Sequence, residues 1–330
     1  MFMKNRRKLL IIAAVISAML VGGCSSKEEI AESKAVENTV VISKELADNF
    51  TSETAYITLN SEKYPVADVM NARVEERITS LKNEMREMAE SAEDNPPMEF
   101  SYNAYQNIYE TEGIISVVLD NANYSGGVHG YHWVEAFVAY KNSDEIIRLS
   151  DLMAEDYGVA EIKSIIKTEI LSAPEMYFPD STDYVDEMDI ESSFYIDETG
   201  KLIIFFNPYE VAPYAAGIVR HEFDADKLKG IIKEEVYAEL KSAENNEEPD
   251  IRLNGVGYTL ENAPKQVEEN GYYSSKFLPL EEIIEITGYN ISAETNEADD
   301  NGYVSFSDLK VILSDAVVTV VSGESICIYY

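Results

Sequence analysis

The sequence predicts an α+β fold, in which a mainly antiparallel sheet with packed helices precedes a small second α+β module. Stripes of apolar residues at helical spacing alternate with short runs of β-branched and aromatic residues. Short turn sequences rich in Gly and Asn separate these runs, as in β-hairpins. Helices interleaved with hairpins favour this class over a doubly wound parallel sheet. At 45% hydrophobic residues, the chain has enough apolar side chains to build such cores.

The N-terminal residues indicate export. A basic segment, Lys4 to Lys8, precedes the apolar run Leu9 to Leu20, which is shorter than the roughly 20 residues that span a bilayer. Small residues then lead into Cys24, and the whole pattern resembles the bacterial lipobox. We therefore expect residues 1–23 to be removed as a signal peptide and Cys24 to be acylated on the outer face of the cell membrane. An uncleaved anchor helix is the alternative.

The mature chain is strongly acidic. Residues 1–23 hold four of the 26 basic groups and no acidic group, so 22 basic groups remain against 61 acidic ones, a net charge of −39. This charge attracts cationic proteins, and the lack of clustered Lys and Arg excludes nucleic acid as a partner. The only cysteines are Cys24 and Cys327, so acylation of Cys24 leaves no disulfide within the chain.

Composition divides the mature chain into four parts. We expect a lipidated tether over residues 24–50, with a first β-like stretch from Thr39, and a main extracytoplasmic domain over residues 51–242. An acidic linker, residues 243–249, then leads to the small C-terminal module, residues 250–330.

The main domain has clear local signals. A helical stripe ends at Pro96-Pro97 and comprises Val74, Ile78, Leu81, Met85 and Met88. Antiparallel strands are expected between Phe100 and Tyr140, with a loop over residues 120–131. Further on we expect helices over 159–171 and 228–240, a hairpin over 194–206, a loop over 207–217 and a strand over 218–223.

The segment Ser125 to Gly130 is the richest in candidate site residues. Strands are expected on both sides of it, so it does not fit a phosphate loop, which opens a helix. Gly126, Gly127 and Gly130 are instead expected to serve backbone conformations with positive φ. His129 and His132 are too few for a zinc site unless carboxylates complete the set. A metal-assisted hydrolase of the cell envelope is therefore only the alternative function.

No catalytic residues or cofactors are predicted. The chain has no G-x-S-x-G nucleophile motif, and its carboxylates are too abundant for any pair to be diagnostic. Residues 297–308 have the spacing of a calcium loop, with Glu297, Asp299, Asn301 and Asp308. Both end positions depart from the preferred residues, so an acidic turn before a strand is the preferred interpretation.

Two sequence blocks resemble a known family. Ile114 to Val118 followed by Tyr124 to Gly130, and then Phe206 to Gly217, resemble an extracytoplasmic domain shared by the lysozyme-sensing anti-sigma factor RsiV and the accessory domain of the peptidoglycan deacetylase PdaC. The resemblance covers about residues 50–240. It implies an α+β recognition domain without catalytic residues of its own. The C-terminal module resembles the small stalk domain of copper amine oxidases, which implies no copper chemistry.

The resemblance and the charge together suggest a binding module. Expected partners are lysozyme or another cationic protein, or peptidoglycan, besides the membrane through Cys24; an accessory structural lipoprotein is equally compatible with the sequence. The binding candidates lie in or beside the two blocks: Tyr124, Gly126, Gly127, His129, Gly130, Tyr131, Tyr209 and Tyr214. For Tyr209 and Tyr214, burial in the core is the preferred expectation.

Overall fold

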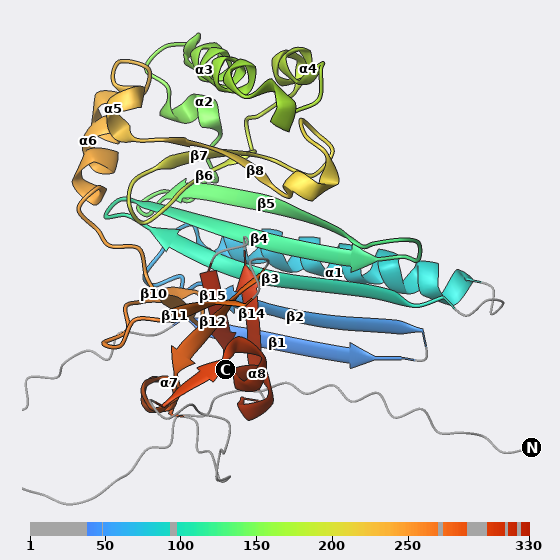
Figure 1. Cartoon of the computed structure of the whole chain (residues 1–330). Coiled ribbons are helices and arrows are strands. Elements are labelled where there is room, and N and C mark those ends of the chain that lie inside the picture. The colour runs from blue at the N-terminus through green and yellow to red at the C-terminus, as the bar shows by residue number, and fades with distance from the viewer. Residues whose placement is uncertain are drawn as a thin grey trace, which may run out of the picture.

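A computed structural model describes residues 38–47, 49–92, 98–269, 273–288, 302–313, 316–321 and 325–330. It confirms the predicted α+β class (Figure 1). Cys24 and residues 297–301 lie outside the described residues. Within the described ranges, no helix has the length and apolar character needed to cross a bilayer.

The main domain is built on a five-stranded sheet, here called sheet A, in the order β1-β2-β3-β4-β5. Its strands are β1 Thr39–Leu46, β2 Phe50–Thr58, β3 Phe100–Glu110, β4 Ile114–Tyr124 and β5 Tyr131–Tyr140. Neighbouring strands are antiparallel except β2 and β3, which are parallel because helix α1, Ala67–Ser91, crosses over between them. Strand β1 lies within the range expected to be tether, so the sheet begins before residue 50.

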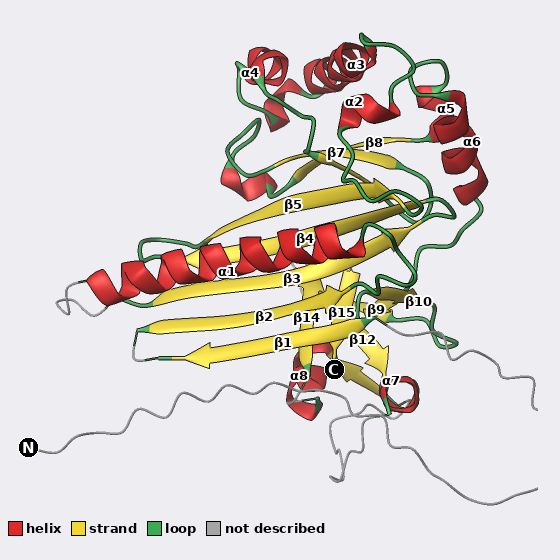
Figure 2. Cartoon of the chain, turned by 180° about the vertical axis from the view of Figure 1, so that it is seen from behind, coloured by secondary structure: helices red, strands yellow, loops and turns green. Residues whose placement is uncertain are grey.

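Helix α1 covers one face of sheet A (Figure 2). Its buried positions include Met70, Val74, Ile78 and Met85, which confirms the predicted stripe up to Met85. Met88 is 44% exposed, so this predicted stripe position does not face the core. Alternate residues of β4 serve two cores: Val117 faces α1, and Val118 faces the opposite layer.

That opposite layer is a three-stranded sheet with short helices around it. The strands are β6 Phe194–Ile196, β7 Leu202–Phe206 and β8 Val219–Phe223, and β6–β7 is the predicted hairpin. The α-helices are α2 Leu149–Leu152, α3 Gly158–Ser172, α4 Ser181–Glu187, α5 Ala225–Leu228 and α6 Glu234–Ala243, with 3-10 turns η1 Pro174–Met176 and η2 Tyr214–Ala216. This layer packs on β4 and β5 through Val118, Val134 and Val138.

Two predicted boundaries are wrong. The single helix expected over 228–240 is divided, because Gly230 adopts φ 84° and Ile232 pairs with Met153 instead of continuing the helix. The loop expected over 120–131 is shorter, since β4 continues to Tyr124 and pairs with both β3 and β5. The buried Asn121 amide accepts a hydrogen bond from the Tyr102 hydroxyl at 2.8 Å.

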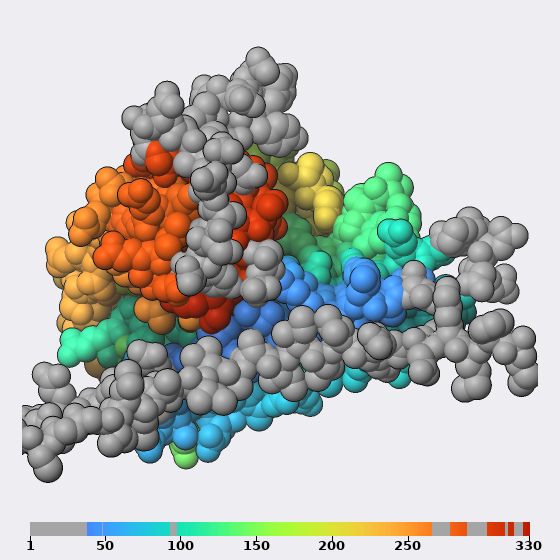
Figure 3. All heavy atoms as spheres, turned by 90° about the horizontal axis from the view of Figure 1, so that it is seen from below, coloured from blue at the N-terminus to red at the C-terminus, as the bar shows by residue number. Residues whose placement is uncertain are grey.

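The C-terminal residues form two small sheets. One has the order β10-β9-β15-β14, from β9 Ile251–Leu253, β10 Val256–Tyr258, β14 Val317–Val321 and β15 Ser325–Tyr329. The other has β11 Lys265–Glu269, β12 Tyr273–Pro279 and β13 Tyr303–Ser305, with helices α7 Leu280–Thr287 and α8 Phe306–Ile312. They share a core that includes Leu278, Ile283 and Leu309. From below, these residues, in orange and red, lie against the blue strands of sheet A (Figure 3).

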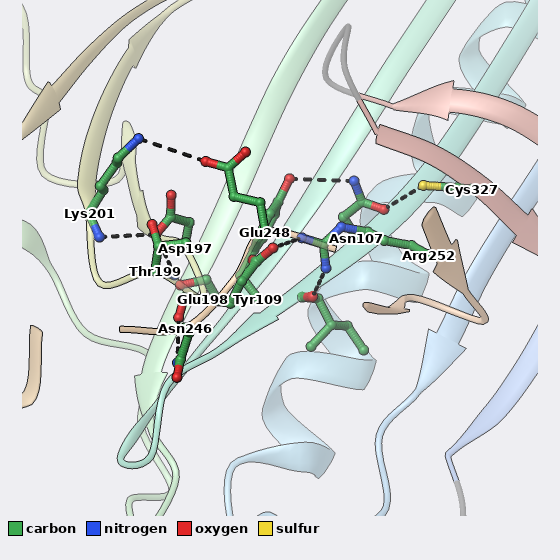
Figure 4. A network of polar contacts seen from close by, with 12 residues as sticks. Asn107, Tyr109, Asp197, Glu198, Thr199, Lys201, Asn246, Glu248, Arg252 and Cys327 are labelled. Carbon is green, nitrogen blue, oxygen red and sulfur yellow. Dashed lines mark hydrogen bonds and ion pairs between the residues drawn. The ribbon is translucent and has the colours of Figure 1, made fainter. Parts of the chain in front are cut away.

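A buried arginine holds the C-terminal residues to the rest of the chain (Figure 4). Arg252 is 2% exposed, and its guanidinium lies 4.2 Å from the centre of the Tyr109 ring. It pairs with Glu198, in the β6–β7 turn, at 2.6 Å and donates to the Ile108 carbonyl at 2.9 Å. The pair therefore joins sheet A, the second layer and the C-terminal module at one point.

Two further hydrogen bonds support this junction. The Cys327 thiol donates to Asn107 Oδ1 at 3.0 Å, and the Tyr329 hydroxyl donates to the Gln106 carbonyl at 2.7 Å. Burial raises the pKa of Cys327 to about 12, so this thiol stays protonated at neutral pH. Both side chains come from β15 and pack on the face of sheet A opposite α1, where the Tyr329 ring stacks on Tyr105.

Candidate functional site

The structure brings the two predicted motif blocks together at one end of sheet A. The β4–β5 connection, residues 125–130, meets the loop between β7 and β8. The His129 ring stacks on the Tyr214 ring, with centroids 4.2 Å apart and planes at 22°. His129 Nε2 lies 3.4 Å from the Tyr209 hydroxyl. We call this end of the sheet the loop end.

Glycines shape the β4–β5 connection. Gly126 and Gly127 have φ of 88° and 101°, which confirms the predicted need for positive φ. Gly130 is required for a different reason, because a Cβ there would lie 2.5 Å from the Asn123 carbonyl oxygen. Val128, between them, is fully exposed at 100%. The connection thus projects an apolar side chain from a constrained turn.

Asn207 fixes the second loop to the edge of sheet A. Its Oδ1 accepts from the Val134 amide at 2.8 Å, and its Nδ2 donates to the Val134 carbonyl at 3.3 Å. The side chain therefore pairs with the outer edge of β5 as a strand residue would. The Asn207 amide in turn donates to Glu210 Oε2 at 2.6 Å. Sequence reasoning missed both residues, although Asn-Pro directly after a strand signals a side-chain-stabilised turn.

Tyr209 lies at the surface and Tyr214 is half-buried, so the expectation that both are buried in the core is wrong. Tyr209 is 53% exposed and adopts φ 72°, which is uncommon for a residue with a side chain. Its ring centre lies 5.6 Å from that of the half-buried Tyr214. Val211 and Ala212 fill the core positions of this loop instead, and this leaves the tyrosines to stack outside.

Tyr131 and Tyr124 lie beside this aromatic group. The Tyr131 ring stacks on Trp133 at 5.7 Å, and its hydroxyl donates to the Pro208 carbonyl at 3.4 Å. The Tyr124 hydroxyl donates to the Gly127 carbonyl at 3.0 Å and so braces the glycine turn. All the tyrosines among the binding candidates therefore lie at the loop end.

The charged groups of the site are acidic. Neither loop contains a Lys or Arg. Burial raises the pKa of Glu210, and only the hydrogen bond from the Asn207 amide opposes that shift. Burial also raises the pKa of Tyr131, and the nearby Glu210 charge adds to the increase. The site therefore presents aromatic rings with negative charge beside them.

The donor set for a metal-assisted hydrolase is missing among the described residues, where no group of three His, Cys, Asp or Glu lies close enough to hold an ion. His129 Nδ1 lies 2.7 Å from the Gly130 carbonyl, and His132 lies edge-on to Tyr214. The third histidine, His221, pairs with Glu169 at 2.8 Å in the second layer.

The expected acidic turn before a strand is described only in part. Glu297, Asp299 and Asn301 lie outside the described residues. Asp308 lies in the first turn of α8, where its amide donates to the Ser305 hydroxyl at 3.1 Å, as in a helix cap.

Two surface hollows lie away from the loop end. One, of about 460 Å³, is lined by Gly113, Tyr140 and Glu239, and the other, of about 400 Å³, by Lys63, Glu198 and Arg252. Both lie near the β3–β4 turn, at the opposite end of sheet A. We favour the loop end as the site because chemically distinctive side chains converge there.

Comparison with known families now adds to this geometry. Two family models match this chain. Residues 43–132 match "Deacetylase PdaC", and residues 150–225 match "Protein of unknown function (DUF3298)". The predicted resemblance to the PdaC accessory domain is thereby confirmed, while the likeness to RsiV and to the copper amine oxidase stalk stays a prediction. The glycine turn lies in the first match and the Tyr209–Tyr214 loop in the second.

Solved structures add only remote similarity. A DUF3298 family member from Bacteroides fragilis is 14% identical with a TM-score of 0.43, covering 62% of this chain and 96% of that one. A DUF3298 family protein from Pseudomonas aeruginosa is 16% identical with a TM-score of 0.44, covering 61% and 94%. No curated protein matches this chain.

Proposed function

We propose that this chain is a membrane-anchored extracytoplasmic lipoprotein whose loop end is a non-catalytic recognition surface. One observation carries the proposal: segments from the two separately matched families converge in the stack of His129, Tyr214 and Tyr209. The match of residues 43–132 to the family model "Deacetylase PdaC" supports a place in the cell envelope. The signal-peptide pattern ending at Cys24 supports export and lipid anchoring.

The proposed partner is lysozyme or another cationic protein. The mature charge of −39 would steer a basic protein toward the chain, an effect that weakens steeply with salt. Charge alone gives weak and promiscuous attraction, since exposed ion pairs contribute at most about 1 kcal/mol each. Specific binding needs rings that can be desolvated, and tyrosine is among the residues enriched at such contacts. Tyr209, half-exposed at the loop end, has that property.

Titration calorimetry of lysozyme into residues 25–330 tests the proposal. We expect binding that persists at physiological salt and weakens at least about tenfold in Tyr209→Ala/Tyr214→Ala, because each lost ring contact at an interface centre costs about 1.4 kcal/mol or more. The matched control is Tyr157→Ala, a tyrosine that is 56% exposed at the start of α3. Binding heat that is detected only at low salt, and is equal in both variants, would indicate nonspecific electrostatic attraction and would contradict the proposal.

The glycan alternative uses the same variants. Purified peptidoglycan in a pull-down replaces lysozyme, and retention that depends on Tyr209 and Tyr214 in this assay alone would identify the wall as the partner. Anchoring is tested separately: a fatty-acid probe in cells should label the wild-type protein and not Cys24→Ser. Equal labelling of the two would refute the lipid anchor.

A further inference from the structure

The loop end carries a second group of exposed side chains beside the aromatic stack. Leu46, Met88, Met98 and Val128 are 85%, 44%, 40% and 100% exposed. Single exposed apolar residues are ordinary on protein surfaces, but several at the same end of a fold are compatible with an interaction site. These four residues come from segments that the fold gathers at one end. We call them the apolar rim.

Strand register places the first part of this rim. Leu46 ends β1 opposite Thr51, close to the start of β2. Phe50, the first residue of β2, pairs with Phe100, the first residue of β3. Met98 precedes Phe100 by two residues, so Leu46 and Met98 lie at the same end of sheet A (Figure 1).

Direct contacts place Val128 and Met88, the other two residues of the apolar rim. A Cβ built on Gly126 would lie 2.6 Å from the Met98 sulfur, so Met98 packs against the glycine turn that carries Val128. Asn49, between β1 and β2, donates to the Ala89 carbonyl at 2.6 Å, which brings the end of α1 and Met88 to the same place. The rim therefore connects β1, α1 and the β4–β5 connection.

The turn that carries Val128 is constrained before any partner arrives. Gly126 and Gly127 hold positive φ, and the Tyr124 hydroxyl is bonded across the turn to the Gly127 carbonyl at 3.0 Å. A side chain presented by such a turn loses little conformational entropy on binding. The hydrogen bond from Tyr124 thus limits the freedom of the turn that presents Val128.

The charges around the rim are negative. Glu87, Glu90 and Glu99 are exposed beside Met88 and Met98. Arg86 is committed to Glu45 at 2.6 Å and does not offset them. An apolar patch bordered by carboxylates fits a partner with an apolar patch bordered by basic residues.

The size of a stable interface also requires more than the aromatic stack. Specific complexes bury about 800 Å² on each partner, drawn from roughly 20–30 residues. The stack of His129, Tyr209 and Tyr214 is too small to supply that area alone. The apolar rim adjoins it through the glycine turn, because Val128 precedes His129 directly.

We propose that the apolar rim is the second half of the binding surface, and that it docks the apolar patch of a basic protein whose cations meet Glu87, Glu90 and Glu99. This inference rests on the proposed function and defines which residues and which partner chemistry complete that site.

The test uses lysozyme as the probe and residues 25–330 at physiological salt. The double variant Leu46→Ser/Val128→Ser should weaken binding at least about tenfold, since each of its two substitutions removes a large apolar contact. The matched control is Leu171→Ser/Val311→Ser, because these residues are similarly exposed, at 67% and 68%, on α3 and α8. Unchanged thermal unfolding in both variants verifies that they fold.

Each outcome separates the two proposals. If Leu46→Ser/Val128→Ser binds as the wild type does while Tyr209→Ala/Tyr214→Ala is weakened, the rim is not part of the site and the proposed function stands. If the wild type does not bind lysozyme, lysozyme is excluded as the partner in both proposals. Sedimentation that shows wild-type dimers and monomeric Leu46→Ser/Val128→Ser would assign the rim to self-association and overturn the inference.

Discussion

Arg252 brings a full positive charge into a buried junction, and its energetic role follows from what surrounds it. Glu198 neutralises it, the Ile108 carbonyl accepts one bond, and the Tyr109 ring covers one face. Arg252 Nε and the second Glu198 oxygen have no hydrogen-bond partner among the described residues. Such a pair contributes little net stability when intact but is costly to break, because the remaining charge stays buried.

Arg252→Met is therefore expected to lower the free energy of unfolding by about 3–5 kcal/mol. Arg252→Met/Glu198→Gln should be less damaging than the single change, because it removes both charges. Urea denaturation measures the difference. Lys167→Met is the control, since its pair with Asp186 at 2.6 Å is at the surface and should cost under about 1 kcal/mol. A double variant less stable than Arg252→Met would contradict this account.

Glu210 and Glu110 are expected to give opposite pH dependence. The pKa of Glu210 is raised by burial, so its protonated form favours the folded state and the stability that it contributes is lost as pH rises through the folded pKa. Burial alone would also raise the pKa of Glu110, but bonds from Lys141 and Tyr64 hold it below the ordinary value. Its stability contribution is present at neutral pH and is lost as pH falls through that lowered pKa.

Glu210→Gln should accordingly match the wild type at about pH 4 and equal or exceed its melting temperature at pH 7, since the unfolded pKa of Glu is about 4.3. Glu110→Gln should do the reverse and melt lower at pH 7, with the difference shrinking in acid. Calorimetric melting of the three proteins at both pH values gives these differences directly. The same sign for both variants would show that their surroundings have been misassigned.

At the scale of elements, local periodicity in the sequence determines where a helix forms, whereas pairing with distant strands determines where a strand ends or a helix breaks. The stripe through Val74, Ile78 and Met85 predicted α1 because one helix face carries that information by itself. The continuation of β4 to Tyr124 could not be predicted, since its Asn-rich end is stabilised by pairing with β3 and β5. The break at Gly230 likewise depends on the pairing of Ile232 with Met153.

The candidate site likewise has features that local sequence predicts and features that depend on tertiary contacts. Positive φ at Gly126 and Gly127 was predictable from the glycine-rich turn between strands. The exposure of Tyr209 and Tyr214 was not, because it depends on Asn207 holding the loop against β5 and on stacking with His129, which comes from a distant segment. Both sequence blocks were visible, but their contact arises only in the tertiary structure.

Asn207→Ala tests whether one side chain aligns the two loops. It leaves the Val134 amide without its 2.8 Å partner, and an unsatisfied, partly buried donor costs about 1–3 kcal/mol. We expect that loss in urea denaturation, together with weaker lysozyme binding because Tyr209 and Tyr214 lose their fixed position. Asn142→Ala, an exposed asparagine after β5, should change neither quantity. Full binding by Asn207→Ala would show that the loop is held by other contacts.

At the scale of the whole molecule, the C-terminal residues have a core of their own and also complete a second one. Leu278 and Leu309 pack within the small module. Val317, Cys327 and Tyr329 pack instead against sheet A, in a cluster that includes Ile57, on the face of the sheet opposite α1 (Figure 2). Gly255 approaches so closely that a Cβ there would lie 2.2 Å from Ile57. The C-terminal residues are therefore bound tightly to sheet A.

Ending the chain at Pro249 should accordingly destabilise the main domain. Each large side chain that loses burial costs roughly 1.5–3 kcal/mol, and the truncated chain loses several such contacts at once. We expect a lower melting temperature and dye binding to the uncovered face of sheet A. The matched comparison is full-length Val311→Ser, which changes an exposed residue of the same module. A truncated chain that melts as the full protein does would show two independent domains.

The direction of β1 bears on how the proposed lipid anchor and the loop end are arranged along the molecule. Fourteen residues lie between Cys24 and Thr39, and such a segment reaches at most about 50 Å from the point of attachment. β1 then runs from Thr39 toward Leu46, so its far end lies about 24 Å further along the strand. An acylated chain would thus attach at one pole of sheet A and carry Tyr209 and Val128 at the other. With the proposed anchor in place, the attachment point and the loop end would therefore lie at opposite ends of sheet A, so a bound partner would not have to fit between the sheet and the tether.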